Sequence, residues 1–219
     1  MATHLDFEEQ EQIDQIKHFW SKWGTPITGM LVIVMGGLAA WSGWQFWQQR
    51  QATQAAILSD AVIVAIQSGD QQRVTQAFND VKSEYPSTIQ AGQSALQVAQ
   101  AAQKDGNSDA AKAALQWAVD NTKDAGYQAT AKLRLAALLI EEKELDAAIT
   151  LLEGNFPVEF QGLAADRLGD ALKLQGQDKE AIAAYQQAWQ LLDPALGYRT
   201  LVGFKLNALG EPTTLETVK

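Results

Sequence analysis

The sequence contains no cysteine and only two histidines, His4 and His18, which both precede its most apolar stretch. Without cysteine the chain forms no disulfide and cannot be a thiol oxidoreductase. The part after residue 50 also lacks histidine, the commonest general base and metal ligand. No GxSxG elbow, GxxxxGK[ST] phosphate loop or EF-hand loop is present. We therefore predict no enzyme and no cofactor; a catalytic domain would require a carboxylate pair with strongly perturbed pKa values.

Charged residues are missing from Trp23 to Gln49, a stretch flanked by Lys22 and Arg50. Its middle, residues 27–46 (ITGMLVIVMGGLAAWSGWQF), is long enough to span the hydrocarbon core of a bilayer at about 1.5 Å per residue. Tryptophans gather near both ends, where indoles suit the membrane interfaces: Trp20, Trp23, Trp41, Trp44 and Trp47. These features predict one transmembrane helix over residues 23–48.

The flanks of this span predict its orientation. The leading segment is acidic and the apolar centre is long, so the pattern is not that of a cleaved signal peptide. Lys17 and Lys22 precede the span, whereas Arg50 alone follows it closely. Because cytoplasmic flanks carry an excess of Lys and Arg, we expect residues 1–22 in the cytoplasm and residues 49–219 on the exported side, which is the type II topology.

The exported part is acidic. Residues 51–219 carry 14 Lys and Arg against 21 Asp and Glu, a net charge of −7. This negative field disfavours binding to nucleic acid and to anionic lipid headgroups. At about 170 residues the segment is long enough for one compact domain with its own core. We expect one folded domain that binds no nucleic acid.

The segment before the span has helical periodicity. Ile13, Ile16, Trp20 and Trp23 recur at three- and four-residue spacing, which predicts a short amphipathic helix in residues 1–22. Five acidic residues against two lysines make it a poor binder of anionic lipid but a candidate docking segment for a cytosolic protein. The alternative is a solvated tail that merely precedes the membrane.

Small residues recur within the span. Gly36 with Ala40, and Ala39 with Gly43, lie four residues apart and permit close approach of a second helix. We therefore predict a candidate transmembrane contact face at Gly36, Ala40 and Gly43. Because Gly and Ala are common in all transmembrane helices, a span without a specific partner is the alternative.

Beyond the span the sequence repeats a helical hairpin pattern. Residues 164–194 place small and aromatic residues around a turn at Gly176 as a tetratricopeptide repeat does, at Leu168, Gly169, Ala181, Tyr185 and Ala188. We expect Gly169 and Ala181 where the two antiparallel helices cross, because a larger side chain would force them apart. Earlier stretches repeat this spacing around turns at Gly69, Gly106 and Lys143–Glu144. The predicted fold class is therefore all-α: a single N-terminal transmembrane helix followed by a tetratricopeptide-like stack of hairpins over about 51–194, which a final helix at 196–209 closes.

First helices of such repeats line the concave surface of the stack, and one of them is more apolar than its core requires. Leu133 and Ile140 are apolar although other residues of the same helix suffice for the core. The neighbouring repeats place acidic residues at one end, which would suit an extended or unfolded polypeptide. The alternative is that neighbouring helices cover Leu133 and Ile140. The predicted groove comprises Leu96, Gln100, Leu133, Ala137, Ile140, Asp166 and Asp170.

The opening MATHLDFEEQEQIDQIKHFW, the anchor AAWSGWQFWQQRQ and the Ala-rich hairpins together resemble the ancillary SecYEG translocon subunit family, the YfgM-like proteins of Gram-negative bacteria. The resemblance runs essentially the whole length. It implies an inner-membrane protein of type II topology with a periplasmic tetratricopeptide-like domain. It also implies association with the SecYEG translocon and the periplasmic chaperone PpiD, and transfer of exported polypeptides toward periplasmic chaperones.

The same resemblance implies an alternative role in the cytosol. Family members are also expected to restrain the response regulator RcsB, which would make the chain a membrane-tethered regulator acting through residues 1–22. The quoted stretches carry no residue-level binding motif for either role.

Overall fold

A computed structural model of the chain describes residues 7–195 and 197–211. Within these residues all nine regular elements are α-helices, which confirms the predicted all-α fold. The chain divides into two compact units, Met1–Arg50 and Gln51–Lys219.

Helix α1 (Phe7–Ser68) contains the predicted transmembrane stretch. Among the described helices it is the one that is long and apolar enough to cross a membrane. Side chains in the middle of the stretch are exposed, 72% for Met30 and 75% for Ile33. A bilayer would bury these side chains, and the helix satisfies its own backbone hydrogen bonds there. Pro26 lies inside α1 without ending it.

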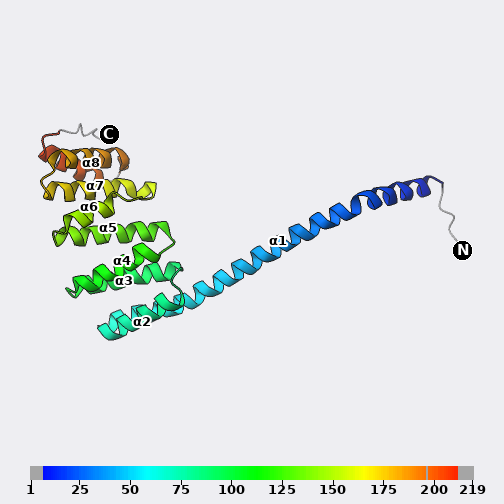
Figure 1. Cartoon of the computed structure of the whole chain (residues 1–219), viewed down its shortest axis with the longest axis horizontal. Coiled ribbons are helices and arrows are strands. Elements are labelled where there is room, and N and C mark those ends of the chain that lie inside the picture. The colour runs from blue at the N-terminus through cyan, green and yellow to red at the C-terminus, as the bar shows by residue number, and fades with distance from the viewer. Residues whose placement is uncertain (1–6, 196, 212–219) are drawn as a thin grey trace. The chain divides into compact units, whose positions relative to one another are not determined.

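The unit after Arg50 consists of four helical hairpins and a closing helix, as the sequence predicts. Successive helices stack upon one another from α2 to α8 (Figure 1). The last turns of α1 share a core cluster with α2. The remaining pairs are α3 with α4, α5 with α6, and α7 with α8. Their bounds are α2 (Gln71–Glu84), α3 (Ile89–Lys104), α4 (Ser108–Asn121), α5 (Ala125–Glu141), α6 (Leu145–Leu152), α7 (Val158–Leu174), α8 (Asp178–Leu191) and α9 (Gly197–Ala208).

Each hairpin turns at a residue with left-handed backbone conformation. Gly69, Gly106 and Gly176 have φ angles of 71°, 75° and 82°, a region that glycine enters without a steric penalty. The third hairpin uses Lys143 instead, with φ 65°. All four turns lie where the sequence predicts them.

Several helices begin at a short polar side chain that caps them. The Asp70 carboxylate accepts hydrogen bonds from the backbone N–H groups of Gln72 and Arg73 at the start of α2. Thr88, Asn107 and Asp124 cap α3, α4 and α5 in the same manner. Each cap satisfies a donor that the helix itself leaves unpaired and is worth about 1 kcal/mol.

Small residues let the two helices of the last hairpin pack closely. A Cβ added to Gly169 of α7 would lie 2.5 Å from the Tyr185 ring of α8. Ala181, also on α8, is fully buried. The predicted role of the Leu-Gly and Ala-x3-Tyr positions as the crossing point of the hairpin is therefore confirmed.

The buried side chains form a nearly continuous core. One cluster runs through the first three hairpins and includes Val62, Val81 and Leu115. A second cluster joins α7, α8 and α9, and the half-buried Ile149 of α6 packs against both. Because neighbouring hairpins share this core, the stack holds its surface side chains on a fixed frame.

Candidate functional site

The predicted groove begins at a hollow between α1 and α3. Gln100 is exposed and lines this hollow of about 530 Å³ together with Ile63, Ile66 and Gln97. Leu96, one turn earlier on α3, is instead buried in the main core. The structure thus leaves Gln100 accessible to a partner and assigns Leu96 to packing.

The apolar centre of the predicted groove is partly covered. Leu133, Ala137 and Ile140 on α5 are each half-buried. Leu133 and Ile140 pack against the small cluster that contains Leu152, and Phe156 covers the same cluster. The surface is therefore shallower than an open apolar groove, and its use as a binding surface stays a prediction.

The acidic end of the predicted groove is closed by α9, which corrects the prediction for Asp166. Its side chain is completely buried rather than open to a partner. Tyr198 Oη donates a hydrogen bond to it at 2.6 Å, and Lys205 Nζ lies 2.8 Å from its other oxygen. A buried carboxylate must be paired in this way. Asp166 therefore attaches the closing helix and is not accessible to a partner.

Asp170 takes part in the same network. It lies 2.7 Å from Lys205 Nζ and accepts a hydrogen bond from Tyr185 Oη at 2.8 Å. Burial raises the pKa of Tyr185 above its ordinary value, and the hydrogen bond to Asp170 raises it further. Burial likewise raises the pKa of Tyr198, with a second contribution from Asp166. Both phenols therefore remain neutral donors.

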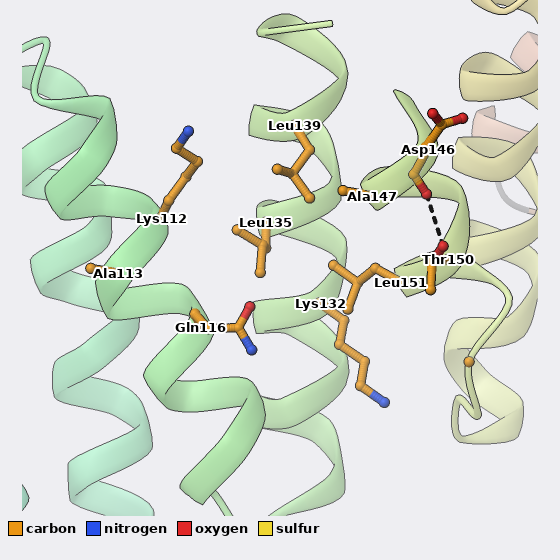
Figure 2. A pocket seen from close by; sticks show the side chains of 11 residues that line it. Lys112, Ala113, Gln116, Lys132, Leu135, Leu139, Asp146, Ala147, Thr150 and Leu151 are labelled. Atoms are coloured by element: carbon orange, nitrogen blue, oxygen red, sulfur yellow. Dashed lines mark hydrogen bonds between the residues drawn. The ribbon is translucent and has the colours of Figure 1, made fainter. Parts of the chain in front are cut away.

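A larger pocket, of about 750 Å³, lies between α4, α5 and α6 (Figure 2). Leu135 and Leu139 of α5 point into it and form its apolar floor. Ala113 and Gln116 line the α4 side, and α6 contributes Ala147, Thr150 and Leu151. This volume is typical of sites that hold a small ligand or a few side chains of a partner.

Two lysines lie at opposite ends of this pocket. Lys112 Nζ pairs with Glu142 and, at 3.0 Å, with Glu144. These hydrogen bonds raise the pKa of Lys112, and the bond from Lys112 lowers the pKa of Glu142. Lys132 Nζ donates to the Asn155 carbonyl at 3.1 Å and has no carboxylate partner among the described residues. Lys132 Nζ also lies 5.4 Å from the centre of the Phe156 ring. An apolar floor beside a positive charge without a carboxylate partner suits an apolar side chain next to an acidic one.

The pocket exists because α6 is short. It spans 8 residues, whereas the second helices α4 and α8 each span 14. The missing turns leave a hollow beside Leu135 and Leu139 of α5, which are themselves buried. Gly154 and Pro157, which follow Leu152 closely, are the signals that predict an early end to this helix. Hairpin periodicity alone did not reveal the pocket.

The groove and the pocket use opposite faces of α5. A residue turns by about 100° around a helix axis relative to the one before it. Leu135 and Leu139 therefore share one face, and Leu133, Ala137 and Ile140 lie on the opposite one. The two surfaces belong to one rigid helix and do not overlap.

The predicted contact face of the anchor is unobstructed within its own unit. A Cβ added to Gly36 or Gly43 would meet no atom within 4 Å. Ala40 lies between them on the same face of α1 and is exposed. No part of the described chain occupies this face, so a partner helix stays a prediction.

No group of three His, Cys, Asp or Glu residues in the described ranges could hold a metal ion. Among those residues the two surfaces also lack a nucleophile held by a neighbouring base.

Comparison with known proteins assigns the chain to a family. A family model for a tetratricopeptide repeat-like domain matches residues 17–211. A Neisseria gonorrhoeae protein named ancillary SecYEG translocon subunit is 30% identical over 213 residues, which cover 95% of this chain and 100% of that protein. The chain belongs to the ancillary SecYEG translocon subunit family.

Two more proteins with this name are similar to the present family member. The Haemophilus influenzae protein is 27% identical over 84% of this chain and 89% of its own length. The Escherichia coli protein is 25% identical over 81% of this chain and 85% of its own length. The repeat-like domain and the name of these relatives point to a family member that is not an enzyme.

Proposed function

We propose that the protein is an inner-membrane scaffold that associates with the SecYEG translocon and helps transfer exported polypeptides to periplasmic chaperones such as PpiD. The names of its relatives support the association with the translocon. The observation that carries the transfer role is the pair of surfaces on opposite faces of α5. Transfer requires two contacts at once, one for the polypeptide and one for the chaperone.

Of the two surfaces, the predicted groove on α3 and α5 is the better candidate for binding the polypeptide. Gln100 is exposed there, and Ala137 and Ile140 are half-buried, so the surface is mixed rather than strongly apolar. The pocket between α4 and α6 is the better candidate for a folded chaperone. Its apolar floor and Lys132, which has no carboxylate partner among the described residues, would recognise a specific apolar and acidic patch.

Photocrosslinking in native membranes tests this division. Probe amino acids at Gly36 and Ala40 should capture translocon subunits, because a close contact requires small residues. A probe at Gln100 should capture an exported chain, and a probe at Gln116 should capture a chaperone. Gln186, an exposed residue of α8, is the control position. Anchor probes that capture only lipid would contradict the translocon association.

The proposed orientation has a direct test because the chain has no cysteine. A single cysteine at Ser21→Cys should be protected from a membrane-impermeant maleimide in cells with a permeabilised outer membrane. A single cysteine at Gln186→Cys should be labelled in the same cells. Labelling of Ser21→Cys alone would place the repeat unit in the cytoplasm.

A second candidate function uses the start of α1. Residues 11–22 are helical, and their apolar side chains are accessible, 67% for Ile16 and 60% for Trp20. An exposed apolar stripe on a helix suits a protein partner. This segment is therefore the proposed cytosolic contact with a response regulator such as RcsB.

Removal of residues 1–21, with Lys22 and the anchor kept, separates the two functions. The scaffold should still crosslink to the translocon through Gly36, whereas binding to the response regulator should be lost. Equal binding of the regulator by the full and the shortened chain would exclude this second function.

A further inference from the structure

One face of α3 carries glutamines along its whole length. Gln90, Gln93, Gln97 and Gln100 recur at intervals of three, four and three residues. This spacing places all four side chains on one side of the helix. We refer to these four residues as the α3 glutamine stripe.

The amides of the stripe have no partner within the described part of the chain. Gln93 and Gln100 are exposed, and the buried Gln97 Oε1 accepts no hydrogen bond there. Glutamines on other helices do have partners: Gln128 donates to the Val119 carbonyl, and Gln71 donates to Asp105. The stripe therefore holds a row of donors and acceptors that no described protein group engages.

Half of the stripe borders the hollow between α1 and α3. Gln97 and Gln100 form one wall of its volume of about 530 Å³, and Ile63 and Ile66 of α1 contribute an apolar surface. Amides beside an apolar surface match a ligand that presents peptide groups and apolar side chains together. The Gln97 side chain is half-buried, so its amide gains more from a hydrogen bond than an amide in water does.

The spacing of the stripe suits an extended polypeptide. Each glutamine amide offers a donor and an acceptor, as does each peptide group. Successive glutamines lie about 4.5–6 Å apart along the helix axis. An extended chain presents peptide groups on one side at intervals of about 6.6–6.8 Å. Flexible glutamine side chains can absorb this difference, so neighbouring amides can each meet a peptide group.

We propose that the α3 glutamine stripe, with Ile63 and Ile66, binds the main chain of an extended polypeptide segment. The stripe carries no charge and addresses peptide groups, so it accepts segments of differing sequence. This inference rests on the proposed function, which it deepens by naming the repeat and the chemistry that hold the exported chain. A folded partner would not present a free row of peptide groups.

Fluorescence anisotropy on the full chain in detergent micelles tests the site. The probe is a labelled decapeptide of alternating Thr and Val with a lysine at each end. Its counterpart is N-methylated at alternate residues, which keeps the side chains but removes donors from one side. We expect the N-methylated peptide to bind at least about tenfold more weakly. Equal affinity of the two peptides would overturn recognition of the main chain.

Variants assign the binding to the stripe. The pair Gln97→Ala and Gln100→Ala should raise the Kd of the parent peptide about tenfold. The matched pair Gln186→Ala and Gln190→Ala removes two exposed amides from α8 and should leave the Kd within twofold. Equal Kd values for the two paired variants would overturn the site. Self-association of the full chain that the Gln97→Ala and Gln100→Ala pair abolishes would also overturn it, because the occupant would then be a second copy of the chain.

Failure of this site is distinguishable from failure of the proposed function. If the parent peptide does not bind while the Gly36 probe captures the translocon, the site is overturned and the translocon association stands. If the peptide binds through the stripe but the Gly36 probe captures no translocon subunit, the site stands and the association falls.

Discussion

Helices α3 and α7 hold equivalent places in the stack but use their polar side chains in opposite ways. The glutamines of α3 have no partners in the described part of the chain. On α7, both Asp166 and Asp170 are engaged by Lys205 and by tyrosine hydroxyls. The difference arises because α9 packs beside α7, whereas none of the described helices covers Gln93 and Gln100 of α3.

This comparison shows which part of the predicted groove is accessible at the surface. The closing helix takes the place that a further hairpin would occupy, and it uses the acidic residues of α7 for attachment. Asp166 and Asp170 of α7 therefore attach α9, whereas Gln93 and Gln100 of α3 stay exposed. Four predictions follow the contrast from its largest effect to its smallest.

Removal of the buried carboxylate should cause the largest loss of stability. Asp166→Ala leaves Lys205 and Tyr198 without their fully buried partner, which we expect to lower the free energy of unfolding by about 3 kcal/mol. Urea unfolding of the full chain in detergent micelles measures it. Asp109→Ala removes an exposed carboxylate at 3.9 Å from Lys112 and should change stability by less than about 0.5 kcal/mol. Equal effects of the two substitutions would mean that the buried carboxylate contributes no more to stability than the exposed one.

A larger side chain at the α7–α8 crossing should cause the next largest decrease in the free energy of unfolding. Gly169→Ala places a methyl group 2.5 Å from the Tyr185 ring, and Tyr185 is held by Asp170. We expect a loss of about 2 kcal/mol from overpacking. In Gly197→Ala the new methyl group meets no atom within 4 Å. A normal unfolding midpoint for Gly169→Ala would show that the crossing can relax.

Alkaline pH should lower the stability of the network that attaches α9, because Tyr185 of α8 and Tyr198 of α9 take part in it. The pKa values of Tyr185 and Tyr198 are raised in the folded state. Above about pH 10 the unfolded chain therefore releases phenol protons that the folded chain retains, so stability is present below that pH and falls as pH rises. The slope is about 1.4 kcal/mol per pH unit for each tyrosine.

Unfolding free energies measured between pH 9 and pH 11.5 test whether stability falls as pH rises. The double variant Tyr185→Phe and Tyr198→Phe should lose most of the pH dependence. Tyr85→Phe serves as the control, because Tyr85 bonds to Gln54 outside this network. An unchanged slope in the double variant would mean that other groups cause the loss of stability at alkaline pH.

Substitution on α3 should have the smallest effect on stability. Gln93→Ala and Gln100→Ala remove exposed amides without partners, and alanine is the better helix former. We expect the free energy of unfolding to stay within about 0.5 kcal/mol of the natural chain. Thermal unfolding followed by circular dichroism measures it. A loss comparable to that of Asp166→Ala would mean that α3 and α7 do not differ in the way described.

Much of the fold follows from local sequence patterns. The turns at Gly69, Gly106 and Gly176 need left-handed backbone, and Gly169 lies where only a small residue fits against Tyr185. Periodicity over each helix is likewise a local property. The final helix, predicted over residues 196–209, spans Gly197–Ala208 in the structure.

The candidate surfaces were harder to predict. Periodicity places Asp166 on the inner face of α7 but cannot show that Lys205 and Tyr198 of α9 reach it from more than 30 residues away. The pocket over Leu135 and Leu139 depends on how far α6 extends beside α4. Both features arise from contacts between hairpins.

The sequence by itself determined the uncharged span, the hairpins, their turns and the absence of cysteine, because each depends on residues that are close in the chain. Tertiary structure alone decided which polar side chains are available. Asp166 is buried because α9 returns to α7, and the amide of Gln100 is exposed because none of the helices within residues 7–211 covers it in the same way. The physical reason is that burial and pairing depend on neighbours that are distant in sequence.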